Sequence, residues 1–239
     1  MIDLVARQVQ ILRAIIEEFI ETAEPVGSET VDKKFNIGVS PATIRNEMVY
    51  LSNQGYLYKP HVSGGRVPTP RALKLYVNEL MKERELSVAD EVSAKEKIWH
   101  SRNELARLLR ESARVLADKS RALGLVMTDD RRLYHSGYAN LLEMPEFYDI
   151  NVMRTVLSMI EQASLMEEIF QQGESEDKVH LVYGKELGEK NLEPVGVMFI
   201  TVNAQGRLCR LGVLGSERFD YPYMVPMMKY FKGLIEEIV

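Results

Sequence analysis

The chain has 239 residues, enough for two domains of ordinary size, and its 46% hydrophobic and 27% charged residues are typical of a globular protein. It contains no apolar run approaching the roughly 18 residues that cross a bilayer, and its first residues lack a signal-peptide core, so we expect no membrane association and a cytoplasmic location. One cysteine, Cys209, excludes an internal disulfide and a multi-cysteine metal site, and its apolar neighbours predict a buried structural thiol.

The net charge of −5 does not by itself suggest a nucleic-acid partner, but the charge is unevenly distributed. Residues 1–84 hold 11 Lys and Arg against 10 Asp and Glu, and the rest of the chain is acidic. Between Ser28 and Val77 the balance is 7 basic against 3 acidic residues. A local basic patch of this kind favours contact with phosphates even on an acidic protein.

Residues 4–23 carry apolar side chains at helical spacing, which predicts an amphipathic helix with a buried stripe from Val5 to Ile20. The segment Glu24-Pro-Val-Gly27 ends this helix. Ser28 is the expected N-cap of a short helix that runs to about Phe35. The turn that follows contains Gly38, which suits a positive φ.

A second capped helix is predicted from Ser40-Pro41 to about Asn53, with proline at the first helical position. Its predicted core face consists of Ile44, Met48 and Leu51. Small and polar residues lie on the outward face, where Asn can bond adenine and Arg can bond guanine in a major groove. Glu47 lies nearer the core and is expected to orient a neighbour. The outward residues are Ala42, Asn46, Val49 and Tyr50, flanked by Thr43 and Arg45.

Two strand-like pieces, Tyr56–Lys59 and Arg66–Pro68, surround a glycine-containing tip and predict a hairpin. Thr69-Pro70 repeats the cap and begins a helix that runs to about Met81. The order of elements is that of a helix-turn-helix followed by a wing, and we favour DNA binding over a helical domain used for protein contacts. The residues expected to contact DNA are Ser28, Lys33, Lys34, Ser40, Ala42, Thr43, Arg45, Asn46, Tyr50, His61, Ser63, Gly64 and Arg66.

The remaining residues predict an α+β domain behind a polar linker at 85–93 and one long helix from about 94 to 122. Packing of that helix onto its own domain is slightly favoured over a dimer seam. Helices are expected over 149–171 and 222–238, and Asn203–Gly206 is a hairpin signal. Strands are expected at Ala122–Met127, Val179–Tyr183, Val195–Val202 and Leu208–Leu214.

Residue patterns of catalysis are missing from the sequence, so we expect no enzymatic activity, no metal and no cofactor. The four histidines are scattered, Gly184-Lys-Glu186 lacks the preceding glycine of a phosphate loop, and no serine stands in a nucleophile elbow. For the segment Gly215–Pro222 we favour a structural role, with Arg218 paired to Asp220 or capping a carbonyl, over a ligand or dimer surface.

Several ordered segments resemble the HrcA family of bacterial heat-inducible transcription repressors. In the N-terminal part they are Glu24–Thr30, Ser40–Met48, Leu51–Leu57 and Pro60–Pro68, and in the C-terminal part Gly137–Leu142, Pro145–Phe147, Gly184–Glu186 and Gly212–Pro222.

The resemblance implies a homodimeric repressor that binds double-stranded operator DNA, an inverted repeat called CIRCE upstream of chaperone operons, and is released under heat stress. It implies that the chaperonin GroEL helps to keep the repressor active. The operator-reading helix would be Ser40–Met48 and the wing Pro60–Pro68, while the C-terminal domain would be GAF-like.

Members of that family are longer and carry an inserted dimerisation domain before the motif that begins at Gly137. Here Ala122–Met127 is followed almost at once by that motif, so we expect a shortened member with a trimmed GAF-like domain. The expected domains are a winged-helix domain at 1–84, a linker and long helix at 85–121, and a regulatory domain at 122–239. The alternative is a GAF-like ligand sensor that acts through protein contacts, with a winged helix that no longer reads sequence.

Overall fold

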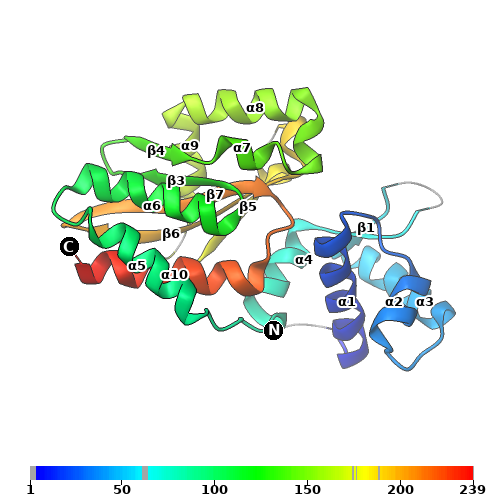
Figure 1. Ribbon diagram of the computed structural model, residues 1–239. Coiled ribbons are helices and arrows are strands. Elements are labelled where there is room, and N and C mark those ends of the chain that lie inside the picture. Colours follow the sequence, from blue (N-terminus) through cyan, green and yellow to red (C-terminus); the bar gives the residue numbers. More distant parts are fainter. Residues whose placement is uncertain (1–3, 61–63, 174, 176, 188, 239) are drawn as a thin grey trace. The chain divides into compact units, whose positions relative to one another are not determined.

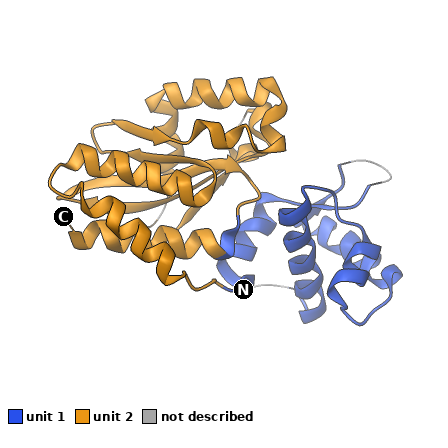
Figure 2. Cartoon of the chain, in the orientation of Figure 1, with its two compact units in different colours: residues 1–82, 220–222 blue, residues 83–219, 223–239 orange. Residues whose placement is uncertain are grey.

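The protein is described by a computed structural model that covers residues 4–60, 64–173, 175, 177–187 and 189–238. The chain divides into two compact units, shown in different colours in Figure 2. Unit 1 comprises residues 1–82 and 220–222, and unit 2 comprises residues 83–219 and 223–239. Helices occur together with two antiparallel sheets, which confirms the α+β class. The domain limits at residues 84 and 121 stay predictions.

In the described residues, unit 1 consists of three helices, a short antiparallel hairpin and a fourth helix that widens into a π-helical turn (Figure 1). This order confirms the elements predicted for the N-terminal part of the chain. The elements are α1 (Ala6–Thr22), α2 (Ser28–Phe35), α3 (Pro41–Asn53), β1 (Leu57–Tyr58), β2 (Val67–Pro68), α4 (Pro70–Leu75) and η1 (Tyr76–Leu80).

Two helices in unit 1 begin with the same N-cap arrangement. The Ser40 hydroxyl accepts a hydrogen bond from the Thr43 amide at 3.2 Å, and the Thr69 hydroxyl accepts one from the Ala72 amide at 3.3 Å. Proline follows each cap, where a missing amide hydrogen costs nothing. Both predicted caps are confirmed, as is the positive φ of Gly38, which is 80°.

Two details of the sequence prediction for unit 1 are wrong. Gly27, not Ser28, is the N-cap residue of α2, and Ser28 is the first residue of the helix and is buried. Val5 does not join the buried stripe, because it precedes α1 as its N-cap residue and is exposed, and Ile11 is buried instead. The core residues predicted for α3, namely Ile44, Met48 and Leu51, are buried as expected.

Unit 2 is built on a five-stranded antiparallel sheet in the order β4-β3-β7-β6-β5. Its strands are β3 (Leu123–Met127), β4 (Leu133–Ser136), β5 (His180–Tyr183), β6 (Val195–Ala204) and β7 (Arg207–Ser216). Its helices are α5 (Val88–Trp99), α6 (Leu105–Ser120), α7 (Tyr138–Leu141), α8 (Ile150–Glu161), α9 (Ala163–Gln171) and α10 (Tyr221–Ile238), and the short η2 (Pro145–Tyr148), η3 (Gly184–Glu186) and η4 (Lys190–Leu192). The first two residues of α10 are assigned to unit 1 and the rest to unit 2.

Helices cover both faces of this sheet (Figure 1). One face, which includes Val197 and Phe199 of β6, packs against apolar side chains of α8 and α9. Gly124 of β3 faces α6 on the other side, where a Cβ atom would lie 2.0 Å from the Ala113 carbonyl oxygen. Because successive side chains of a strand point to opposite faces, a sheet covered twice needs nearly continuous apolar strands. This explains why β6 is buried along most of its length.

The strands predicted at 122–127, 179–183, 195–202 and 208–214 are confirmed with small changes at their ends. The hairpin at 203–206 is also confirmed, with positive φ values of 54° at Gln205 and 77° at Gly206. β4 was not predicted, because this edge strand is only half buried and gives a weak alternation of apolar and polar residues.

The predicted linker at 85–93 and single helix at 94–122 are wrong. Ser87 caps α5, which therefore begins inside the expected linker, and the chain leaves the helical conformation before Glu104, whose φ is −132°. The short polar residues after Trp99 disfavour a continuous helix because their side chains compete for backbone groups. The helix predicted over 149–171 is likewise two helices, separated at Gln162.

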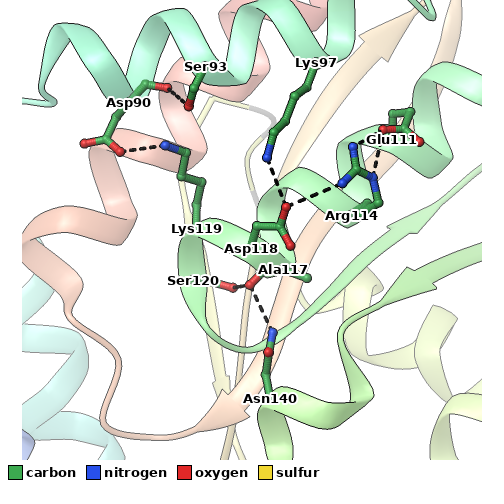
Figure 3. Close-up of polar contacts among 10 residues, drawn as sticks. All are labelled: Asp90, Ser93, Lys97, Glu111, Arg114, Ala117, Asp118, Lys119, Ser120 and Asn140. Carbon is green, nitrogen blue, oxygen red and sulfur yellow. Dashed lines mark hydrogen bonds and ion pairs between the residues drawn. The ribbon is translucent and has the colours of Figure 1, made fainter.

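Ion pairs join α5 to α6 (Figure 3). Lys119 contacts Asp90 at 2.7 Å, and Lys97 contacts Asp118 at 3.2 Å. The bond from Lys119 holds the pKa of Asp90 below its ordinary value, with a further contribution from Ser87. Together with the buried side chains of α6, these contacts confirm that this helix packs within its own domain.

The motif that begins at Gly137 holds the end of α6. The Asn140 side-chain amide donates to the carbonyl oxygens of Ala117, at 3.1 Å, and Ala122, at 2.9 Å (the first is drawn in Figure 3). Gly137 has a φ of 96°, and a Cβ atom there would lie 2.7 Å from the Ala117 Cβ. Helix ends leave carbonyls without partners, and Asn140 satisfies one of them, that of Ala117, together with the Ala122 carbonyl just before β3.

We predict that Asn140→Ala lowers the free energy of unfolding by about 1–2 kcal/mol, because two half-buried carbonyl oxygens lose their donor. Urea unfolding followed by circular dichroism measures the change. Asn103→Ala, which alters an exposed asparagine, serves as the matched control and should change stability by less than about 0.5 kcal/mol. Equal effects of the two substitutions would contradict this role of Asn140.

Candidate nucleic-acid interface

The exposed face of α3 is the candidate interface. Ala42, Arg45, Asn46, Val49 and Tyr50 are all exposed, as the helical spacing predicts. Val49 is 43% exposed near the middle of this face, an unusual place for an aliphatic side chain. The face thus presents a small residue, a cation, an amide, an aliphatic group and an aromatic ring along one helix.

The start of α3 presents two hydroxyl groups as well. The Ser40 and Thr43 hydroxyl oxygens lie 3.0 Å apart, and Ser40 is exposed. The N-terminus of a helix carries a partial positive charge and has amide groups without intrahelical partners. This end of α3 is therefore suited to an anionic oxygen.

Glu47 ties α3 to α1. The Arg7 Nε donates to Glu47 Oε1 at 2.9 Å, and the Gln8 side-chain amide donates to Glu47 Oε2 at 3.0 Å. The Glu47 side chain is only 13% exposed, and these bonds, that of Gln8 first, lower its pKa below the ordinary value. The prediction that Glu47 orients a neighbour is confirmed. The carboxylate therefore links α3 to the start of α1.

The hairpin is held against the rest of unit 1 by Arg66. Its backbone forms an isolated antiparallel bridge with Val26, and its Nε donates to the Ser52 hydroxyl at 3.0 Å. Gly65 lies so close to this bridge that a Cβ atom would be 2.4 Å from the Val26 carbonyl oxygen. The base of the hairpin is therefore fixed relative to α3.

Arg71 was not singled out from the sequence and secures the other end of α3. Its guanidinium carbon lies 4.5 Å from the centre of the Tyr56 ring, and Nη1 donates to the Gln54 carbonyl oxygen at 2.9 Å. Arg7 and Gln8 were also missed. The sequence signals for all three are weak, because each acts on a residue distant in the chain.

The structure brings most of the predicted contact residues to the surface around α3, but two do not suit contact. Ser28 is buried. Lys34 pairs with Glu18 at 2.8 Å and with Glu21 at 3.7 Å, so its charge is matched within unit 1, and the bond to Glu18 raises its pKa. His61 and Ser63 lie outside the described residues. The remaining predicted contact residues are exposed or half-exposed, and they are Lys33, Ser40, Ala42, Thr43, Arg45, Asn46, Tyr50, Gly64 and Arg66.

Unit 2 has fewer features of a binding site than α3. Among the residues that the structure describes, no group of three or more His, Cys, Asp or Glu side chains is placed to hold a metal ion, and none of the helices is both long and apolar enough to cross a membrane. A cleft of about 530 Å³ lies between α8, α9 and the η3–η4 segment, with both apolar and polar residues in its wall. Cys209 is buried in β7, as predicted, and burial raises its pKa to about 11.

The structure gives Arg218 a partner that was not predicted. Arg218 pairs with Glu146 of η2, and the Ser216 hydroxyl donates to the same carboxylate at 2.8 Å. These bonds lower the pKa of Glu146 although burial raises it. Burial raises the pKa of the neighbouring Glu217 to about 7. The segment therefore has the structural role that was favoured, connecting β7 to η2.

A family model described as "HrcA protein C terminal domain" matches residues 69–225. Curated relatives over nearly the whole chain include the "Heat-inducible transcription repressor HrcA" of Symbiobacterium thermophilum, which is 27% identical and aligned over 97% of this chain and 98% of its own length. The protein of the same name from Clostridium tetani is 45% identical over 123 residues, or 51% of this chain and 35% of its own length.

The alignment with the Symbiobacterium protein runs over 333 positions, whereas this chain has 239 residues. A substantial part of that relative therefore has no counterpart here. Among solved structures, one described as "a hypothetical protein at 2.2 A resolution" superposes with a TM-score of 0.78 at 18% identity, covering 99% of this chain and 98% of that one. This likeness supports the fold.

We predict that Glu47→Ala lowers the free energy of unfolding by about 1–2 kcal/mol at pH 7, because the hydrogen bonds from Arg7 and Gln8 to a carboxylate are lost. The folded-state pKa of Glu47 is depressed, so its contribution is complete above the ordinary pKa of about 4.3 and is lost as the pH falls through the lower folded value. Urea unfolding at several pH values from 7 to about 3 should show the variant and the wild type converging. The exposed Glu24→Ala is the control, and a pH-independent difference for Glu47→Ala would contradict the assignment.

Proposed function

Because the chain belongs to the HrcA family, whose curated relatives are heat-inducible transcription repressors, we propose that it represses chaperone operons by reading operator DNA with α3. The observation that carries this proposal is the exposed face of α3, held in one orientation by Glu47. Unit 1 is a winged helix-turn-helix in this proposal. Its helix-turn-helix is α2 with α3, and its wing is the hairpin of β1 and β2.

The side chains of α3 divide into those that read bases and those that hold the backbone. Asn46 can bond the edge of adenine with two hydrogen bonds, and Arg45 can do the same with guanine. Val49 can contact the methyl group of thymine, and Ala42 allows a close approach to the groove. Ser40 and Thr43, at the N-terminus of the helix, are placed to bind phosphate.

Contacts outside α3 position the unit on the duplex. Lys33 of α2 and Lys59 at the end of β1 are exposed cations suited to phosphates. The wing would lie along the backbone or in the minor groove, with Arg66 at its base and Gly64 near its tip. His61 and Ser63 remain proposed wing contacts. Ser28 and Lys34 are omitted, since the first is buried and the second is paired with acids of α1.

The operator we propose is an inverted repeat of the CIRCE type, bound by a homodimer and released under heat stress. Helix-turn-helix dimers need half-sites on one face of the duplex, about 34 Å or a multiple apart. Unit 2 would then be a GAF-like regulatory domain with a role in pairing two chains, and GroEL the partner that favours the active form. The family membership favours this reading over a ligand sensor that does not read sequence.

Asn46→Ala and Arg45→Ala should each weaken binding to the operator by about 1–3 kcal/mol and relax the preference at one base position. Fluorescence anisotropy with a CIRCE duplex, its single-base variants and a random duplex measures this. Arg107→Ala and Asn103→Ala, at exposed positions of unit 2, are the matched controls and should bind like wild type. Equal losses on operator and random DNA would assign these residues to the backbone instead.

Lys33→Ala should weaken binding to operator and random DNA alike, because a phosphate contact carries no sequence information. The slope of log K against log salt concentration should become shallower by about 0.9 for the one contact removed. Lys190→Ala, an exposed lysine of unit 2, is the control. A slope unchanged by Lys33→Ala would place Lys33 outside the contact surface.

A further inference from the structure

One face of α8 carries an apolar and charged stripe that unit 2 leaves uncovered. Ile150 is 73% exposed and Leu157 is 39% exposed, and both lie beside the buried face of the helix. Arg154 and Glu161 are exposed on the same stripe, because these four positions are spaced by four, three and four residues. In Figure 1, α8 is the outermost helix on its side of the sheet of unit 2.

Neither charged residue of this stripe forms an ion pair with another described residue. Arg154 donates to the Asn151 amide oxygen one turn earlier, at 3.1 Å. Within the described part of the chain, no carboxylate pairs with Arg154 and no cation pairs with Glu161. An arginine and a glutamate on a surface stripe that also exposes aliphatic side chains are typical of the rim of a protein contact.

The order of the stripe is self-complementary. Arg154 precedes Leu157 by about one helical turn, and Glu161 follows Leu157 by about one turn. If two copies of α8 cross antiparallel with a two-fold axis at Leu157, Leu157 meets its own symmetry mate. Arg154 of each copy then faces Glu161 of the other, which gives two reciprocal ion pairs. An unrelated partner would not require a cation about one turn before an apolar centre and an anion about one turn after it.

We propose that this stripe of α8, consisting of Ile150, Arg154, Leu157 and Glu161, is a two-fold contact between two copies of the chain. The proposal rests on the proposed function in one respect, since it supplies the pairing that an inverted-repeat operator requires. A contact of one helix with its mate buries little surface, so the dimer is weak and depends on both ion pairs. Exposed Tyr148, just before α8, extends the apolar surface at its edge.

The test is a charge exchange across the contact. Arg154→Glu leaves two carboxylates facing two carboxylates in a homodimer, and Glu161→Arg leaves cations facing cations. Each variant alone should dimerise about tenfold more weakly than wild type, as measured by sedimentation equilibrium without DNA up to about 100 μM. An equimolar mixture of the two variants should form a heterodimer with near wild-type affinity, because both ion pairs are then restored with reversed polarity.

Matched controls are Arg110→Glu and Glu96→Arg, which make the same charge changes at exposed positions of α6 and α5. Circular dichroism verifies that every variant keeps its fold. The proposal is overturned by a wild-type chain that stays monomeric at about 100 μM, by variants that dimerise like wild type, or by a mixture that does not recover dimerisation.

The assay separates this proposal from the proposed function. Sedimentation without DNA reports on α8, whereas binding of a single half-site by one copy reports on α3. Loss of pairing with intact half-site recognition would overturn only the role of α8. Intact pairing without preference for the operator would overturn only the reading of bases by α3.

Discussion

The Glu47 carboxylate is the contact on which the geometry of unit 1 depends. It accepts hydrogen bonds from Arg7 and Gln8 of α1, and so couples the first helix to the one with the exposed face. Buried Ile44, Met48 and Leu51 pack α3 against the core, and the hydrogen bonds to a carboxylate add a directional contact. Core packing and this contact together define which residues of α3 face outward.

Most of unit 1 could be predicted from the sequence because its signals are local. A cap and a proline at Ser40 and Thr69, and a glycine at a positive φ in the turn, act within a few residues of where they stand. The periodic apolar residues of α3 likewise defined its buried and exposed faces. What the sequence could not show is the contact of Arg7 with Glu47, which joins residues 40 positions apart.

In unit 2 the sequence predictions that were wrong failed for the same reason, because the deciding contacts join residues that are distant in the chain. The amphipathic pattern from 94 to 122 is continuous enough to suggest one helix, yet the chain turns back before Glu104 and places α5 against α6. Two ion pairs between the helices fix this arrangement, Lys119 with Asp90 and Lys97 with Asp118. Such pairs produce no periodic pattern in the sequence. The role of Asn140 was equally hidden, because its acceptors belong to the end of α6 and the start of the sheet.

Cys209 adds a chemical property to this architecture. Its thiol lies buried in the central strand β7, and burial raises its pKa to about 11, which disfavours the thiolate that peroxides and electrophiles attack. The only cysteine of the chain is thus withheld from oxidation as long as the sheet is intact. The reactivity of this thiol therefore depends on whether β7 opens.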